Sequence, residues 1–167
     1  STDGSYYIVV GEGQENRYKQ VIVVPSFHED LPVKEIGDNA FSNGNYAQVI
    51  LQEGITKIGN ASFDDCNYLT EIHLPTTLKS IGYLAFGECM FASITLPEGL
   101  EFIGESAFYR CINLQELYIP ENVMMIEDDL CYQCTSLKTI EVSPANANYV
   151  SKDNALFTKD MKQLMIY

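Results

Sequence analysis

Apolar residues recur along this chain with a period of about 22 residues. The clearest marker is an isoleucine followed, five residues later, by a phenylalanine in four copies and by a cysteine in the fifth. The isoleucines are Ile36, Ile58, Ile81, Ile103 and Ile126, so their spacing is nearly constant. A repeat of this length cannot bury its apolar residues alone, so neighbouring repeats must stack into a solenoid.

A second motif of the form apolar-x-x-apolar-x-apolar runs in step with the first. Its copies begin at Tyr46, Leu69, Phe91, Leu114 and Leu137. In the second copy, the alternation predicts a short strand that buries Ile72 and Leu74 and exposes Glu71 and His73. Proline follows three of these strands and ends them, because it has no N–H to donate onward. We therefore predict short parallel strands that form one main sheet, with turns and short helical turns on the opposite side.

The residues between the two motifs indicate what fills the interior. Glycine follows the isoleucine in four copies, which indicates a backbone turn that a side chain would strain. We expect the phenylalanines to stack from repeat to repeat as an interior spine. They are Phe41, Phe63, Phe86 and Phe108.

Taken together, these motifs closely resemble the BspA-like leucine-rich-repeat family. The unit I-G-x-x-A-F-x-x-C-x-x-L-x-x-L-x-L-P is specific to that group, and the resemblance covers roughly Val21 to Tyr167. The segment Asn148 to Phe157 also resembles the family's ending, in which a short hairpin follows the last repeat. The resemblance implies an adhesion module of a secreted or surface-exposed bacterial protein, located outside the cell. It also implies a protein or peptide partner, on a host cell or a neighbouring cell.

We expect a mainly β leucine-rich-repeat solenoid with hairpin-type caps at both ends. Residues 1–35 are predicted to form an N-terminal strand pair, from Tyr6 to Val10 and from Val21 to Val24, with an atypical first repeat. Residues 36–142 hold five repeats, and residues 143–167 form a C-terminal hairpin cap. The fifth repeat departs from the pattern at Glu127, Leu130 and Cys131, as an end repeat would.

Composition narrows the range of partners. The chain has 167 residues, of which 46% are hydrophobic, and 23 acidic against 10 basic residues give a formal net charge of −13. Such a surface repels phosphate backbones and anionic lipid, which argues against nucleic acid and membrane surfaces as partners. No apolar run is long enough to span a membrane, and no signal-peptide pattern is present in this chain. Residues Ser1 to Ser5 are interpreted as the exposed remnant of a longer chain.

Four of the five cysteines occupy the same position of the repeat, which allows two interpretations. The four are Cys66, Cys89, Cys111 and Cys134, and they recur with the period of the isoleucines. Stacked repeats would place them about 5 Å apart, within disulfide range for Cα atoms. Their recurrence three residues after the spine position favours small buried thiols instead.

Other chemically active residues do not assemble into a site. Cys131 and Cys134 form a C-x-x-C pair, but without the strand and helix of a thioredoxin-like motif, and zinc would need two more ligands. Glu127 to Asp129 lack the spacing of a calcium loop, so a solvated acidic turn is favoured. Neither His28 nor His73 has a nucleophile beside it in the sequence. We therefore expect no enzyme activity, no cofactor and no metal.

The outward positions of the predicted sheet form two columns that we expect to carry a ligand. The candidate ligand-binding residues are Gln48, Glu71, Ser93, Glu116 and Thr139 in one column, and Ile50, His73, Thr95, Tyr118 and Glu141 in the other. Ile50, His73 and Tyr118 are the expected anchors, since amphipathic aromatic residues dominate interface energetics. The alternative is a structural stalk with no ligand, in which these residues are only solvated.

Overall fold

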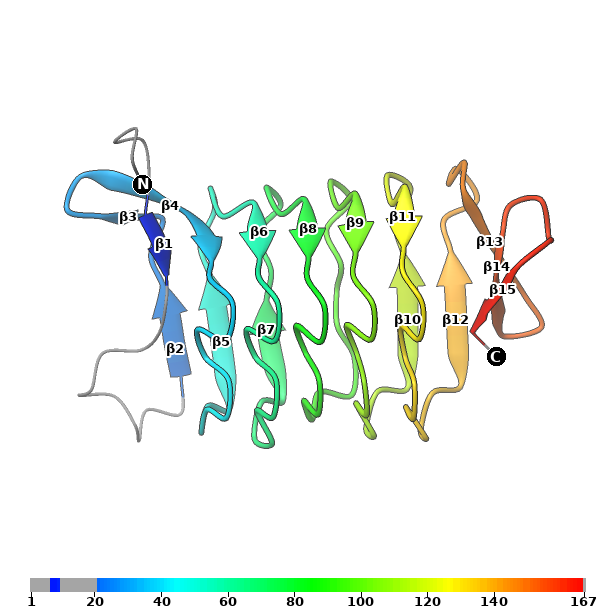
Figure 1. The fold of residues 1–167 in the computed structure, drawn as a ribbon, viewed down its shortest axis with the longest axis horizontal. Coiled ribbons are helices and arrows are strands. Elements are labelled where there is room, and N and C mark those ends of the chain that lie inside the picture. Colours follow the sequence, from blue (N-terminus) through cyan, green and yellow to red (C-terminus); the bar gives the residue numbers. More distant parts are fainter. Residues whose placement is uncertain (1–6, 10–20, 167) are drawn as a thin grey trace.

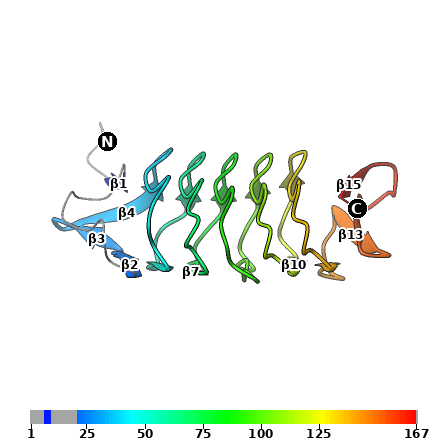
Figure 2. The same cartoon turned by 90° about the horizontal axis from the view of Figure 1, so that it is seen from below.

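The computed structural model describes residues 7–9 and 21–166, and they wind into a rod-shaped solenoid in which each repeat is one coil (Figure 1). The expectations for residues 1–6 and for Val10 lie outside the described residues. Each coil passes through two faces of the rod, which carry two different parallel sheets. Seen from below, the coils follow one another side by side along the axis (Figure 2). The predicted leucine-rich-repeat solenoid is confirmed.

Sheet I runs along the front of Figure 1 and is continuous over six strands. Its strands are β1 (Tyr7–Val9), β4 (Leu31–Ile36), β6 (Lys57–Ile58), β8 (Ser80–Ile81), β9 (Phe102–Ile103) and β11 (Met125–Ile126). The recurring isoleucines are paired from strand to strand, as Ile58 with Ile81 and Ile81 with Ile103. Each repeat adds one short strand because successive coils stack at the spacing of paired strands.

Sheet II lies behind sheet I and contains the strands predicted from the second motif. One part is β2 (Val21–Val24), β5 (Gln48–Leu51) and β7 (Glu71–His73), and the other is β10 (Glu116–Ile119) and β12 (Thr139–Val142). Between the two parts, the third repeat contributes no strand, and only an isolated bridge joins Ser93 to Glu116. The expectation of one main sheet was therefore wrong: the chain forms sheets on both faces, and sheet II is interrupted.

The short helical turns were also predicted wrongly, since no helix occurs within the described ranges 7–9 and 21–166. The segments that follow the isoleucines are tight arcs (residues 37–43, 59–66, 82–89, 104–111 and 127–134). Two residues of each arc have positive φ, as Leu84 (50°) and Glu88 (56°) do in the third. Other amides of the arcs donate hydrogen bonds to the next coil. Phe63 N–H donates to the Ala85 carbonyl at 2.9 Å, and Phe86 N–H donates to the Ala107 carbonyl at 2.9 Å. Alternate amides donate to the next coil and left-handed residues interrupt the arc, so the bonds within an arc, such as Ala85 N–H to the Gly82 carbonyl at 3.3 Å, stay isolated turns and do not build a helix.

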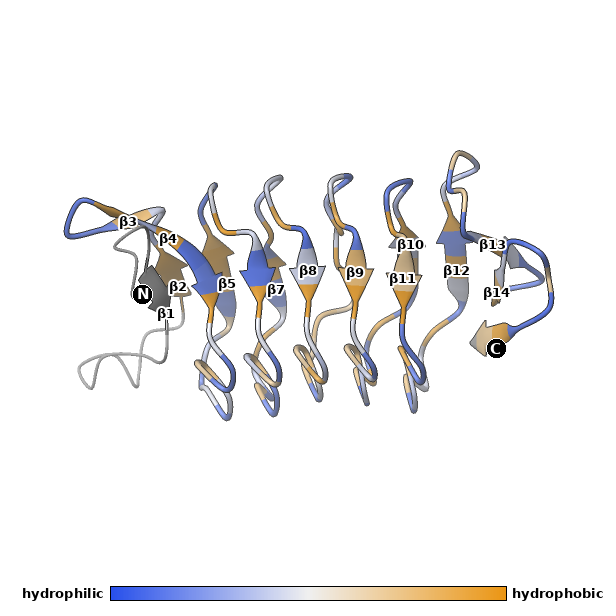
Figure 3. Ribbon diagram, turned by 45° about the horizontal axis from the view of Figure 1, so that its top comes forward, coloured by the Kyte–Doolittle hydropathy of each residue, from blue (hydrophilic) through white to orange (hydrophobic). Residues whose placement is uncertain are grey.

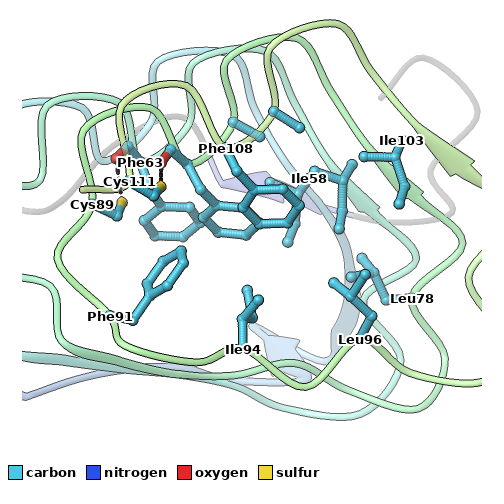
Figure 4. Close-up of a cluster of buried hydrophobic side chains, with 14 of the residues drawn as sticks. Ile58, Phe63, Leu78, Cys89, Phe91, Ile94, Leu96, Ile103, Phe108 and Cys111 are labelled. Atoms are coloured by element: carbon cyan, nitrogen blue, oxygen red, sulfur yellow. Dashed lines mark hydrogen bonds between the residues drawn. The ribbon is translucent and has the colours of Figure 1, made fainter. Parts of the chain in front are cut away.

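The core lies between the two sheets and the arcs, and it runs the length of the rod. Figure 4 shows the phenylalanine rings stacked under the arcs, with Ile94 and Leu96 arriving from the opposite side. Ring centroids are 5.2 Å apart for Phe41–Phe63, 5.7 Å for Phe63–Phe86 and 5.7 Å for Phe86–Phe108, with interplanar angles of 12° or less. The predicted spine is confirmed.

The glycines after the isoleucines are required by close approach and not by an unusual φ. A Cβ added to Gly82 would lie 2.6 Å from Asn60 Oδ1 and 2.8 Å from the Asn60 backbone nitrogen. Gly59 and Gly104 meet the preceding coil in the same way. Glycine at this position therefore sets how tightly the coils stack.

The N-terminal end of the rod differs from the hairpin cap that the sequence predicted. Strands β1 and β2 do not pair with each other, because β1 continues sheet I beside β4 and β2 continues sheet II beside β5. A short hairpin is formed instead by β3 (Phe27–His28) and the start of β4, joined by Glu29 and Asp30 with φ of 47° and 63°. Two consecutive left-handed residues are typical of a two-residue hairpin turn.

At the C-terminal side, three antiparallel strands follow the last repeat. They are β13 (Tyr149–Lys152), β14 (Ala155–Thr158) and β15 (Leu164–Ile166). The turn between β13 and β14 again has two left-handed residues, Asp153 and Asn154. Tyr149 is buried, and its hydroxyl oxygen accepts a hydrogen bond from the Ile126 amide at 2.7 Å, which ties this sheet to the last strand of sheet I.

Candidate ligand-binding surface

The register of sheet II aligns most of the two columns expected from the sequence. Gln48 is paired with Glu71 and Ile50 with His73. Glu116 is paired with Thr139, and Tyr118 with Glu141. Three of the ten column residues are half-buried: Gln48, Ile50 and Thr139. The other seven are exposed: Glu71, His73, Ser93, Thr95, Glu116, Tyr118 and Glu141. The columns therefore face outward, as the alternation predicted.

The side chains of the first half of the columns form a polar cluster. His73 Nε2 lies 2.8 Å from Glu71 Oε1 and 3.1 Å from Gln48 Nε2. Both contacts are made by the same imidazole nitrogen, which donates to the Glu71 carboxylate when it is protonated and accepts from the Gln48 amide when it is not. Tyr118 stands in the other half of sheet II, with 41% of its surface exposed. The structure thus brings Gln48, Glu71 and His73 together and leaves Tyr118 across the interruption from them.

A slit opens at the interruption, between β7 and residues 92–97. It has a volume of about 650 Å³ and takes in four of the ten candidate residues: Glu71, His73, Ser93 and Thr95. Its other lining residues include Thr70, Thr76 and Ala92. Ile72 and Leu74 at its base are only half-buried, whereas Val49 and Leu51 at the same positions of β5 are 0% and 3% exposed. The sheet face is therefore not flat but is cut by an opening that reaches the edge of the core.

The sequence of the third repeat explains the opening. Leu69 is the third residue after Cys66, and Leu114 is the third after Cys111, but Phe91 is only the second after Cys89. In addition, Phe91 stands where those repeats have leucine. Its ring packs edge-on against Phe86 and Phe108, with centroids 6.0 and 6.3 Å away. A shorter link and a larger side chain together account for the lack of strand pairing between residues 92–97 and β7.

Sequence reasoning missed the outward positions of sheet I. These are Glu35, Lys57, Ser80, Phe102 and Met125, aligned by the strand register. Figure 3 shows the change along this face, where β6 begins hydrophilic and β9 and β11 are hydrophobic. Met124 and Met125 are 60% and 53% exposed. The column could have been found only by recognising that these residues form strands. Strands of two residues are too short to show an alternating pattern in the sequence.

The four cysteines that share one repeat position (Cys66, Cys89, Cys111 and Cys134) form a ladder along the rod, and they donate hydrogen bonds as well as filling space. No disulfide is formed by the five cysteines, all of which the structure describes. Each ladder thiol donates to the carbonyl of the spine residue one coil earlier, as Cys89 to Phe63 at 3.2 Å and Cys111 to Phe86 at 3.1 Å; both bonds are drawn in Figure 4. The preference for buried thiols is thus confirmed at Cys66, Cys89 and Cys111, which are buried.

Cys134 is the exception, because it is only partly buried. It lines a cavity of about 460 Å³ between the last arc and the turn at Asp153 and Asn154. When Cys134 is ionised, Cys111 donates to its sulfur instead of to the Phe86 carbonyl, and Cys131 donates to it as well; this lowers the pKa of Cys134 and raises the pKa of Cys111 and Cys131. Cys134 is therefore the thiol of the chain that is best placed to react.

The remaining sequence candidates do not gather into a site. Glu127, Asp128 and Asp129 are all exposed, and Glu127 accepts a hydrogen bond from the Glu105 amide at 3.0 Å. Within the described residues, no three histidine, cysteine or acidic side chains cluster as metal ligands would. Nor does that part of the chain contain a helix long and apolar enough to cross a bilayer.

The repeat, the double-sheeted coil and the cysteine ladder define a class of protein, the bacterial-type leucine-rich-repeat solenoids. Comparison with known families agrees: residues 34–160 match the BspA type leucine rich repeat region in six copies. The chain belongs to this family. No curated protein sequence matches it.

Several similar solved structures are longer than this chain. The T. pallidum leucine-rich-repeat protein TpLRR is 32% identical with a TM-score of 0.71, over 72% of this chain and 57% of that one. A leucine-rich-repeat protein from Bacteroides ovatus is 26% identical with a TM-score of 0.53, over 72% of this chain and 39% of that one. The pneumococcal vaccine antigen PcpA, at 24% identity and a TM-score of 0.69, shares the fold over 93% of this chain and 48% of its own. The chain thus spans between about two fifths and three fifths of these proteins.

Proposed function

We propose that this chain is a protein-binding module of a secreted or surface-exposed bacterial protein and that its ligand docks on sheet II. The observation that carries the proposal is the pair of outward columns, which present Tyr118 and the Gln48–Glu71–His73 cluster on the same face of the rod, on either side of the slit. Repeat proteins commonly use such continuous surfaces for binding. The BspA-type family supports the same role, and the net charge of −13 favours neutral or cationic protein partners.

The alternative is a stalk that holds another domain away from the cell and has no ligand of its own. It predicts that substitutions on either sheet leave every interaction of the parent protein unchanged. The binding proposal predicts that the two faces behave differently. This difference can be measured.

The experiment is a binding screen against extracellular-matrix proteins and host glycoproteins, followed by affinity measurements on two double variants. Tyr118→Ala with His73→Ala removes two of the expected anchors, which are exposed, so the fold should persist. We expect affinity to fall by about 2 kcal/mol or more, the loss typical of interface anchors.

The matched control is Met125→Ala with Lys57→Ala, two exposed residues on sheet I. It should change affinity by less than about 0.5 kcal/mol, as substitutions outside an interface do. Circular dichroism of all variants reports folding. Equal affinity of the folded sheet II variant and the wild type, for every ligand found, would refute the proposal and favour the stalk.

A further inference from the structure

The slit in sheet II exposes main-chain groups that the repeats on either side of it use for pairing. In the second repeat, the Glu71 amide donates to the Ala47 carbonyl at 3.2 Å, and in the fifth the Thr139 amide donates to the Gln115 carbonyl at 3.2 Å. The equivalent bond in the third repeat would join the Ser93 amide to the Thr70 carbonyl. No hydrogen bond of this kind joins residues 70–74 to residues 92–96, all of which the structure describes.

Both walls of the slit therefore offer unpaired donors and acceptors. On one wall, Glu71 directs its amide toward β5, so Ile72, the next residue of the strand, directs its N–H and C=O into the slit. On the other wall, Ser93 and Thr95 have the positions that would donate across it. An occupant of the slit must therefore supply matching acceptors and donors, because displacing water without replacing its hydrogen bonds is costly.

The remaining lining of the slit selects the chemistry of the occupant. Ile72 and Leu74 provide an apolar base, while Glu71, one of whose carboxylate oxygens contacts His73 at 2.8 Å, contributes an exposed carboxylate at the rim. None of the residues that line the slit is lysine or arginine. An occupant with a long aliphatic stem and a cationic head satisfies both features at once.

We propose that this slit receives an arginine side chain carried by an extended segment of the partner protein. This inference rests on the proposed function and specifies the partner's chemistry. The guanidinium group bonds to the Glu71 carboxylate and the free carbonyls of Thr70 and Ile72, while the stem lies on Ile72 and Leu74. The segment's own carbonyls accept from the amides of Ser93 and Thr95. Arginine fits better than lysine because its planar fork donates to several oxygens at once.

The test uses three synthetic peptides and calorimetric titration at about 0.15 M salt, where long-range attraction to the acidic protein is screened. The probe is acetyl-Thr-Val-Arg-Val-Thr-amide. One control replaces arginine with citrulline, which keeps the shape and removes the charge. The other replaces both valine carbonyls with thiocarbonyls, which are weaker hydrogen-bond acceptors for the amides of Ser93 and Thr95. We expect the probe to bind and each control to bind at least tenfold more weakly.

Protein variants complete the test. Glu71→Gln should weaken binding of the probe at least tenfold, whereas Glu105→Gln, an exposed acid of the fourth arc and outside sheet II, should change it less than twofold. The inference is overturned by no measurable binding of the probe, by equal affinity for the citrulline peptide, or by equal effects of the two variants. If the probe fails while Tyr118→Ala with His73→Ala still weakens a protein ligand, only the slit is refuted and the binding function stands.

Discussion

At the scale of single residues, the ladder cysteines are both interior filler and hydrogen-bond donors. A thiol is small enough for the space beneath the arc, and its S–H donates a hydrogen bond to a spine carbonyl of the preceding coil. Cys134 ends the ladder at the last coil and faces a cavity, so its surroundings differ from those of the other three. Position in the stack, and not residue type, therefore distinguishes Cys134 from the three buried thiols of the ladder.

We expect iodoacetamide to label one thiol in the native protein, Cys134, and all five after denaturation. The lowered pKa of Cys134 means that its thiolate persists as the pH falls from about 8.5, the ordinary thiol value, to 7 and below. Its labelling rate should thus fall little across that range. Mass spectrometry of labelled peptides is the measurement, with Cys134→Ser as the control that labels at no site in the native state. Native labelling at Cys66 or Cys89, or a steep loss of rate between pH 8.5 and 7, would contradict this assignment.

At the scale of elements, the arcs and the phenylalanine spine bind one coil to the next. An inner phenylalanine such as Phe86 has a stacked ring on each side and the edge of Phe91 below it. Phe41, near the N-terminal end, has one stacked neighbour, Phe63, and the edge of Tyr46. The packing around the spine is therefore densest in the middle of the rod.

Phe86→Ala should destabilise the protein by about 3–5 kcal/mol, the usual cost of truncating a buried aromatic residue. Phe41→Ala should lower the free energy of unfolding by less, because Phe41 lies near the end of the rod and has fewer packed neighbours around the cavity that the substitution creates. Chemical denaturation of both variants, followed by circular dichroism, gives the two free energies of unfolding. Equal losses would count against a spine whose contribution depends on its place in the stack.

The strands show which features of the fold could be predicted from the sequence. Alternation at Glu71 to Leu74 and the recurrence of the isoleucines were sufficient for the columns of sheet II and for the spine. The two-residue strands of sheet I were not predictable from alternation, because two residues carry no period. The absence of helices from the described chain follows from left-handed residues such as Leu84 and Glu88, whose side chains give no sign of positive φ. The slit depends on the link between Cys89 and Phe91, which is one residue shorter than in the neighbouring repeats. Because the repeats vary between 22 and 23 residues anyway, this difference does not stand out in the sequence.

At the scale of the whole molecule, the rod has two faces of different character. Sheet I is continuous and becomes apolar toward β11, whereas sheet II is interrupted and polar around His73 and the slit. The length of the rod follows from the number of coils, so a longer relative can extend either face without changing the repeat. The boundaries at residues 35 and 142 remain our division of the chain into ends and repeats.

The claim that a ligand docks on sheet II is tested most directly by hydrogen exchange of the amides with and without a bound protein ligand. Using a ligand from the binding screen, we expect slower exchange in β5, β7, residues 92–97 and β10 on binding. The amides of β6, β8 and β9 on sheet I should exchange at unchanged rates. Protection confined to sheet I or to the arcs would contradict the account and move the binding surface to another face of the rod.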